Sequence, residues 1–141
     1  MAAALVFCAF ACTASVDTVR VRAPAPESIF VRVVQTIERN CVGIDVVDDA
    51  SGGYVMSIWR QWPLEVGAMR SRCVATITTA PGQAYSEVQV SFVVKYCAPE
   101  GSPEAAEYPP DGCQVVSELP EDVAKALTRS GAQIEAELQQ R

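Results

Sequence analysis

Histidine is absent from this 141-residue sequence. Its absence removes the commonest general base and the commonest metal ligand of proteins, which argues against most hydrolases and metalloenzymes. Basic residues are also scarce, since 11 Lys and Arg stand against 17 Asp and Glu, giving a formal net charge of −6. A phosphate-binding face needs clustered Lys and Arg, so no nucleic-acid partner is expected. We therefore predict a protein that is not an enzyme and that binds no cofactor or metal.

The sequence begins with an uncharged apolar run that is too short to span a membrane. Residues 2–11 have about the length of a signal-peptide hydrophobic region, whereas a spanning helix needs about 20 apolar residues. Ala9 and Ala11 occupy positions −3 and −1 before Cys12, a pattern that resembles the lipobox of bacterial lipoproteins. That resemblance implies that Cys12 is lipidated and becomes the first mature residue. Two features depart from the lipobox pattern: Ala9 stands where Leu is typical, and no Lys or Arg precedes the run. The missing basic residues are expected if the true start codon lies further upstream. The alternatives are ordinary secretion and a cytosolic thiol protein.

The parity of the cysteines favours lipidation over ordinary secretion. Cleavage before Cys12 removes Cys8 and leaves five cysteines, which is an odd number. If Cys12 carries lipid, four cysteines remain, enough for two disulfides in an oxidising compartment. The sequence therefore indicates an extracytoplasmic protein with disulfide bonds.

The positions of the remaining four cysteines favour one pairing. Cys97 and Cys113 enclose 15 residues rich in Pro and acidic side chains. A disulfide across such a loop stabilises a fold by about 3 kcal/mol. Cys41 and Cys73 then form the second pair, although other pairings stay open at this point. No C-x-x-C spacing is present, which argues against a zinc site.

Hydrophobic patterning divides the rest of the chain into a tether, two helices and two hairpins. Residues 13–26 combine small residues, Pro and mixed charge, as a tether does. Residues 27–40 carry one apolar stripe at helical spacing, and residues 119–141 carry another. Residues 42–62 indicate two strands joined at a Ser-Gly-Gly turn, and residues 70–97 indicate a second hairpin with alternating apolar positions.

These elements predict an α+β fold. We expect a helix, a four-stranded antiparallel sheet and a second helix, with both helices packed on one face of the sheet. The predicted organisation is a signal peptide over residues 1–11, the lipidated cysteine and a flexible tether over residues 12–26, and a single domain over residues 27–141.

One segment of the predicted domain carries a resemblance to a known family. The run "IFVRVVQTIERNCVGIDVVDDASGGYVMSIW" places an amphipathic helix before a short strand, an Asp-rich turn with Gly, and a second strand with a Trp. This order resembles small helix-grip lipoprotein domains, such as the family of the C-subunit lipoprotein of the bacterial outer-membrane β-barrel assembly machinery. The resemblance covers residues 28–62 and implies an accessory or scaffold role in the envelope. The four cysteines are a departure from that family.

Two short stretches are candidate sites. "SIWRQWP" holds Trp59, Arg60 and Trp62, and because residues three apart in a strand face opposite sides, one Trp should lie off the core face. An exposed Trp beside Arg is typical of a protein interface, and the alternative is edge packing with Arg stacked on the ring. "DVVDDASGG", with Asp45 and Asp48, is interpreted as a solvated hairpin turn rather than a calcium loop.

The combined prediction is an outer-membrane lipoprotein that faces the periplasm. Two or more acyl chains on Cys12 would hold it in the membrane, and Thr13 is consistent with sorting to the outer membrane. The domain would bind an envelope protein of unknown identity. The alternative is a soluble secreted or periplasmic module that binds a small ligand between the C-terminal helix and the sheet.

Overall fold

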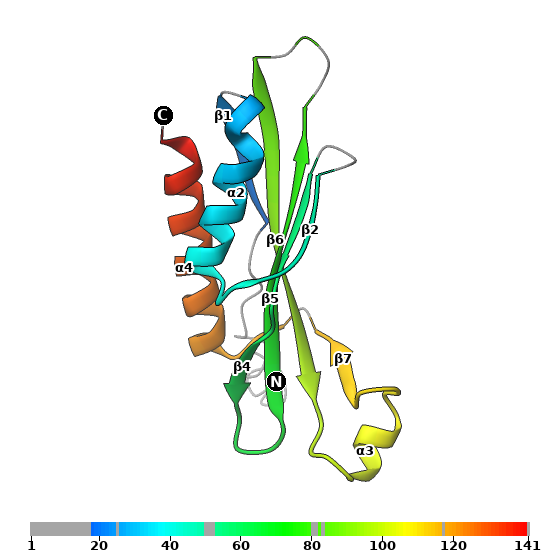
Figure 1. Cartoon of the computed structure of the whole chain (residues 1–141). Coiled ribbons are helices and arrows are strands. Elements are labelled where there is room, and N and C mark those ends of the chain that lie inside the picture. Colours follow the sequence, from blue (N-terminus) through cyan, green and yellow to red (C-terminus); the bar gives the residue numbers. More distant parts are fainter. Residues whose placement is uncertain are drawn as a thin grey trace, which may run out of the picture.

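The computed structural model describes residues 18–24, 26–49, 53–79, 82, 84–116 and 118–140. Two long helices pack on one face of a twisted antiparallel sheet (Figure 1). In chain order the elements are β1 (Val19–Pro24), α2 (Pro26–Asn40), β2 (Ile44–Asp48), β3 (Tyr54–Ser57), β4 (Arg60–Pro63), β5 (Ala68–Thr78), β6 (Tyr85–Cys97), α3 (Pro103–Ala106), β7 (Cys113–Val115) and α4 (Glu121–Gln139).

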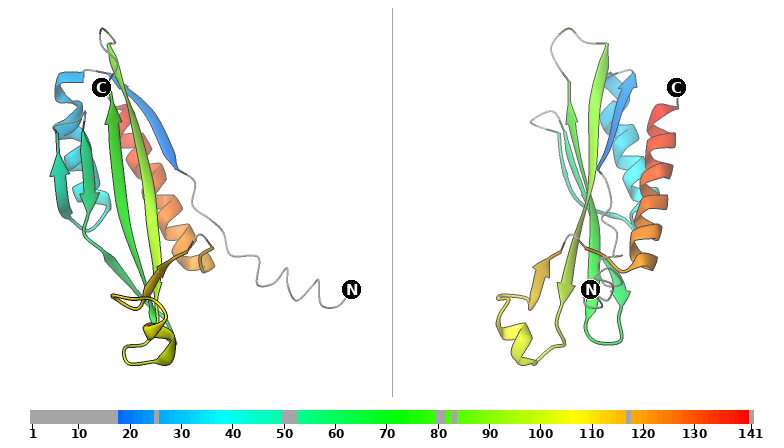
Figure 2. Two further views of the ribbon diagram at one scale, coloured as in Figure 1. Left: turned by 90° about the vertical axis from the view of Figure 1, so that its right-hand side faces the viewer. Right: turned by 180° about the vertical axis from the view of Figure 1, so that it is seen from behind.

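The two longest strands, β5 and β6, form the centre of the sheet. The strand order is β1-β6-β5-β3-β2, while β4 also pairs with β5 and β7 also pairs with β6. Every pairing is antiparallel. Helices α2 and α4 lie on one side of the sheet, and the lobe that carries α3 and β7 projects on the other (Figures 1 and 2).

The α+β class and the antiparallel sheet are confirmed, but the predicted count of four strands is too low, because the described residues form a sheet of seven. The range 42–62 contains three strands instead of two. The chain steps out of register at Ile58 and Trp59, so β3 and β4 pair with successive parts of β5. Strand β7 was also not predicted, because it has only three residues and follows a Pro-rich loop, so its apolar alternation is too short to recognise.

The tether predicted over residues 12–26 is too long, and the domain boundary at residue 27 is wrong. Residues 19–24 form β1, which pairs with β6. Val21 and Ala23 are buried in the core, whereas Arg20 and Arg22 are exposed. This is the period-two pattern of a half-buried strand, which the Pro and Ala residues around it obscured. Residues 1–17, including Cys12 and the expected signal peptide, lie outside the described residues.

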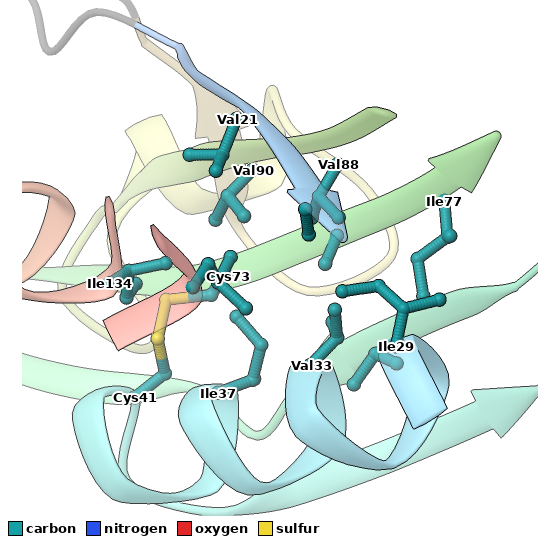
Figure 3. Packing of buried hydrophobic residues seen from close by; sticks show 14 residues of the cluster. Val21, Ile29, Val33, Ile37, Cys41, Cys73, Ile77, Val88, Val90 and Ile134 are labelled. Atoms are coloured by element: carbon teal, nitrogen blue, oxygen red, sulfur yellow. A yellow bond between two sulfur atoms is a disulfide. The ribbon is translucent and has the colours of Figure 1, made fainter. Parts of the chain in front are cut away.

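The main core lies between α2, the end of α4 and the sheet. Ile29, Val33 and Ile37 of α2 are buried, as the helical stripe predicts. They pack against the alternate positions of β5 and β6, and Ile134 and Leu138 of α4 complete the cluster (Figure 3). Burial of these branched side chains stabilises a helix whose β-branched residues give it low intrinsic helicity.

A second cluster lies between the first half of α4 and the end of the sheet that carries β4. Leu119, Val123 and Leu127 pack there against residues of β4, β5 and β6. Further along α4, Gly131 permits a close approach to the sheet. A Cβ at this position would lie 3.1 Å from Cγ2 of Val19 and 3.5 Å from Cε2 of Phe92. The glycine that weakens the helix therefore brings it into contact with β1.

Helices α2 and α4 are also joined by a polar contact. Arg32 donates hydrogen bonds to the carbonyl oxygens of Glu137 at 3.2 Å and Leu138 at 3.0 Å, and to that of Gln140. These carbonyls lie at the C-terminal end of α4, where the regular helical hydrogen bonds stop, although that of Glu137 also accepts the N–H of Gln140 at 3.4 Å. The guanidinium also opposes the negative end of the helix dipole. Arg32 thus acts as the C-terminal cap of α4.

Both pairs of cysteines that the sequence favours are joined in the structure. Cys41 and Cys73 form a disulfide with a Cα–Cα distance of 6.2 Å, linking the segment after α2 to β5 inside the main core (Figure 3). Cys97 and Cys113 form the second, with a Cα–Cα distance of 4.0 Å between β6 and β7. The second disulfide closes the lobe that carries α3.

Candidate functional site

The side of the sheet opposite α2 and α4 is called here the open face. Its central positions come from alternate residues of β5 and β6 and include Arg70, Arg72 and Lys95, three cations in a chain with an excess of acids. Arg70 and Lys95 are direct neighbours across the two strands. Asp111 approaches Lys95 at 3.8 Å from the α3 lobe, so acidic groups border this basic centre.

Trp59 lies over the open face at the step between β3 and β4. The Arg72 guanidinium carbon is 4.1 Å from the centroid of its ring, and the Lys95 ammonium nitrogen is 5.4 Å away. Such cation–π contacts contribute about 0.5–1 kcal/mol at exposed sites. The indole is therefore held in place by two cations while it remains partly exposed.

Arg72 connects Trp59 to the neighbouring strands. Its Nη2 donates to Oδ2 of Asp45 on β2 at 3.1 Å, and its Nη1 donates to Sδ of Met56 on β3 at 2.9 Å. Its Nε is buried and has no hydrogen-bond partner within the described part of the chain. One side chain thus joins β5 to β2, β3 and the Trp59 step.

Trp62 faces the helix side of the sheet, opposite to Trp59. Its Nε1 donates a hydrogen bond to Oγ of Ser71 at 2.8 Å, and its ring packs against the second core cluster. The Arg60 guanidinium carbon lies 4.0 Å from the centroid of the Trp62 ring. Edge packing thus describes Arg60 and Trp62, whereas Trp59 alone of the three lies on the open face.

The outer edge of β2 is a feature that the sequence interpretation missed. Asp45 and Asp48 lie in β2 and not in a turn, because the strand covers Ile44–Asp48. Between them, Val46 is 39% exposed and Val47 is 46% exposed. The hairpin predicted over residues 42–62 does place a strand before the Ser-Gly-Gly turn, but the Asp-rich composition led to Asp45 and Asp48 being assigned to the turn, and the exposed edge was not recognised.

The crevice between the helices and the sheet is small. It is lined by Cys41, Phe92, Leu127 and Ser130 among others, and its interior of about 10 Å³ has room for about one water molecule. Small-molecule sites are typically about 300–1,000 Å³. A more open, polar hollow lies between Arg70 and the lobe closed by Cys97 and Cys113.

The described residues contain no group of three or more Cys, Asp or Glu side chains placed to hold a metal ion. None of the described helices is both long enough and apolar enough to cross a membrane. The chain matches no protein-family model and no curated protein. The likeness to the C-subunit lipoprotein family therefore stays a prediction.

Proposed function

We propose that this chain is a non-enzymatic outer-membrane lipoprotein whose periplasmic domain binds an envelope protein at the sheet edge around Trp59. The observation that carries the proposal is the position of Trp59. It is a large aromatic side chain that lies off the core, on the open face, and is fixed between Arg72 and Lys95.

The chemistry of this edge supports protein binding. Trp and Arg are enriched among residues that dominate binding energy at interfaces, and a pre-positioned ring loses little conformational entropy on binding. The small helix–sheet crevice counts against the alternative, a module that encloses a small ligand between α4 and the sheet.

The two disulfides support an extracytoplasmic location. Four cysteines are joined in two pairs, and such bonds persist in oxidising compartments such as the periplasm. With these four paired, Cys12 is the cysteine available for a lipid anchor once Cys8 is removed with the leader.

The anchor is tested by metabolic labelling with palmitate in a Gram-negative host. The unmodified chain should incorporate label and fractionate with the outer membrane, and Cys12→Ser should lose both properties. Cys8→Ser is the matched control and should keep them. A soluble, unlabelled mature protein would refute the anchor.

The binding site is tested by photo-crosslinking in intact envelopes. A photoreactive amino acid at Gln61, exposed beside Trp59, should give a discrete crosslinked species that can be identified by mass spectrometry. Trp59→Ala should abolish that species. The same probe at Arg129, exposed on α4, serves as the control. If Gln61 and Arg129 give the same products, or if Trp59→Ala has no effect, the proposed site is wrong.

A further inference from the structure

Strand β2 ends the sheet at one side. It pairs with β3, and no described strand lies on its other side. The outward N–H and C=O groups of an edge strand are available to pair with an extended segment of another chain. The first residue of β2, Ile44, pairs with Ser57, which is followed in the chain by the exposed Ile58 and then by Trp59. This edge therefore adjoins the candidate site.

The side chains of β2 differ between its two faces. On the open face, Asp45 approaches Arg72, and both Val46 and Asp48 lie opposite open-face residues of β3. On the helix side, Ile44 packs against the main core and Val47 lies opposite the buried Val55. A strand added alongside β2 therefore meets two carboxylates on one face and apolar side chains on the other.

The acids argue against a second copy of this chain as the added strand. Antiparallel self-pairing centred on Val46 and Val47 would place Asp45 of each copy opposite Asp48 of the other. Like charges directly opposite across a strand pair are destabilising. The same carboxylates favour a strand with basic side chains.

We propose that β2 accepts an extended segment of the partner in which Lys or Arg alternates with Val or Ile. The basic residues lie on the open face beside Asp45 and Asp48, and the apolar residues cover Val47 on the helix side. Main-chain hydrogen bonds to β2 supply the common part of the binding energy, and the alternation supplies specificity. This inference rests on the proposed function, because it describes how the partner would bind.

The test uses a fluorescent seven-residue peptide in which four Lys alternate with three Val. It is titrated by anisotropy into the full chain, purified from envelopes in non-ionic detergent with its disulfides intact. The peptide should bind at low salt, and the corresponding Glu–Val peptide should not. Val47→Lys should weaken binding by about tenfold or more, because it removes the apolar contact with the Val residues of the peptide and places a charged group against them. Val66→Lys is the matched control, because Val66 is 64% exposed and lies in the loop between β4 and β5. It should leave affinity within about twofold.

The backbone contribution is tested by N-methylation of the same peptide. In an added strand, alternate residues direct their N–H groups toward β2. N-methylation of one of the two sets of residues, Val or Lys, should therefore abolish binding, and N-methylation of the other set should preserve it. If both methylated peptides bind as well as the parent, the peptide docks by side chains alone and strand addition is wrong. Concentration-dependent dimers that Val47→Lys abolishes would also overturn the proposal, because the occupant would then be a second copy.

The two proposals fail in different ways. If the Gln61 crosslink depends on Trp59 but the Lys–Val peptide does not bind, the protein-binding function stands and the basic strand is wrong. If the peptide binds but no Trp59-dependent crosslink forms in the envelope, the β2 edge has the proposed chemistry and the proposed function is wrong.

Discussion

Removal of the Cys41–Cys73 disulfide should destabilise the domain more than removal of the Cys97–Cys113 disulfide. The two bonds have sequence separations of 32 and 16 residues. Loop-closure entropy gives about 3.7 kcal/mol for the longer loop and about 3.1 kcal/mol for the shorter. Chain entropy alone thus separates them by only about 0.6 kcal/mol.

The packing of Cys41 and Cys73 increases the difference. They are 5% and 4% exposed and belong to the main core cluster. Replacement of both by Ala removes two sulfur atoms from a close-packed region, at about 1 kcal/mol each by analogy with a deleted methylene. The total, about 5–6 kcal/mol, is comparable to the whole stability of many domains. Cys97 and Cys113 are also buried, at 7% and 9% exposed, but they lie outside both core clusters, so their loss leaves those clusters intact.

The assay is urea unfolding of the two double-Ala variants, followed by far-UV circular dichroism under non-reducing conditions. We expect the Cys41→Ala/Cys73→Ala variant to be largely unfolded at 37 °C, and the Cys97→Ala/Cys113→Ala variant to keep a cooperative transition shifted by about 3 kcal/mol. The reasoning is refuted if the two variants lose equal stability, or if the first loses less than about 1 kcal/mol. In the second case the bond between α2 and β5 would not be structural, and the argument for an oxidising compartment would weaken.

Three further predictions concern single residues. Arg32→Ala should lower the free energy of unfolding by about 1–3 kcal/mol, because the last carbonyls of α4 lose their cap. Arg39→Ala should lower it by less than about 1 kcal/mol, because the Arg39 side chain of that ion pair is 61% exposed. Urea midpoints measure both. Val42→Asn should raise thermal stability by about 0.5–1 kcal/mol, because Val42 is exposed and its φ of 64° is unfavourable for a β-branched residue; a lower melting temperature would contradict this. Trp62→Ala should cost about 2–4 kcal/mol and Trp59→Ala under about 1 kcal/mol, since Trp62 alone packs in a core cluster; comparable losses would show that the two rings are not on different faces.

The sequence predicts the two long helices well, because their burial follows directly from a 3.6-residue period. It does not predict α3, which has four residues and buries none of them. Ile29, Val33 and Ile37 are buried as expected, and so are Val123 and Leu127 of α4. Within a helix, the face that packs is determined by the segment itself, so local pattern is enough to identify it.

The strands at the margins of the sheet could not be predicted in the same way. Residues 19–24 become a strand because β6 is 13 residues long and leaves an edge that they can pair with, a fact about a distant segment. The strand before the Ser-Gly-Gly turn was predicted, but Asp45 and Asp48 were assigned to a turn, although both lie in β2. A strand tolerates them here because the edge is exposed and Asp45 forms an ion pair with Arg72. The period of two predicted that one of the two Trp side chains lies off the core face, but not which one. The cations that contact Trp59 come from β5 and β6, so their identity depends on the register of these strands.

Arg72 is the residue that makes the β2 edge and Trp59 parts of one surface. Its guanidinium contacts Asp45 on β2, Met56 on β3 and the Trp59 ring, yet its Nε is buried without a hydrogen-bond partner in the described chain. An unsatisfied buried polar atom costs about 1–3 kcal/mol, which an apolar side chain such as Met would avoid. The contacts of the guanidinium with Asp45, Met56 and the Trp59 ring offset that cost and hold the indole beside β2. A partner strand that engages Asp45, as proposed above, would therefore also act on Trp59 through the same guanidinium.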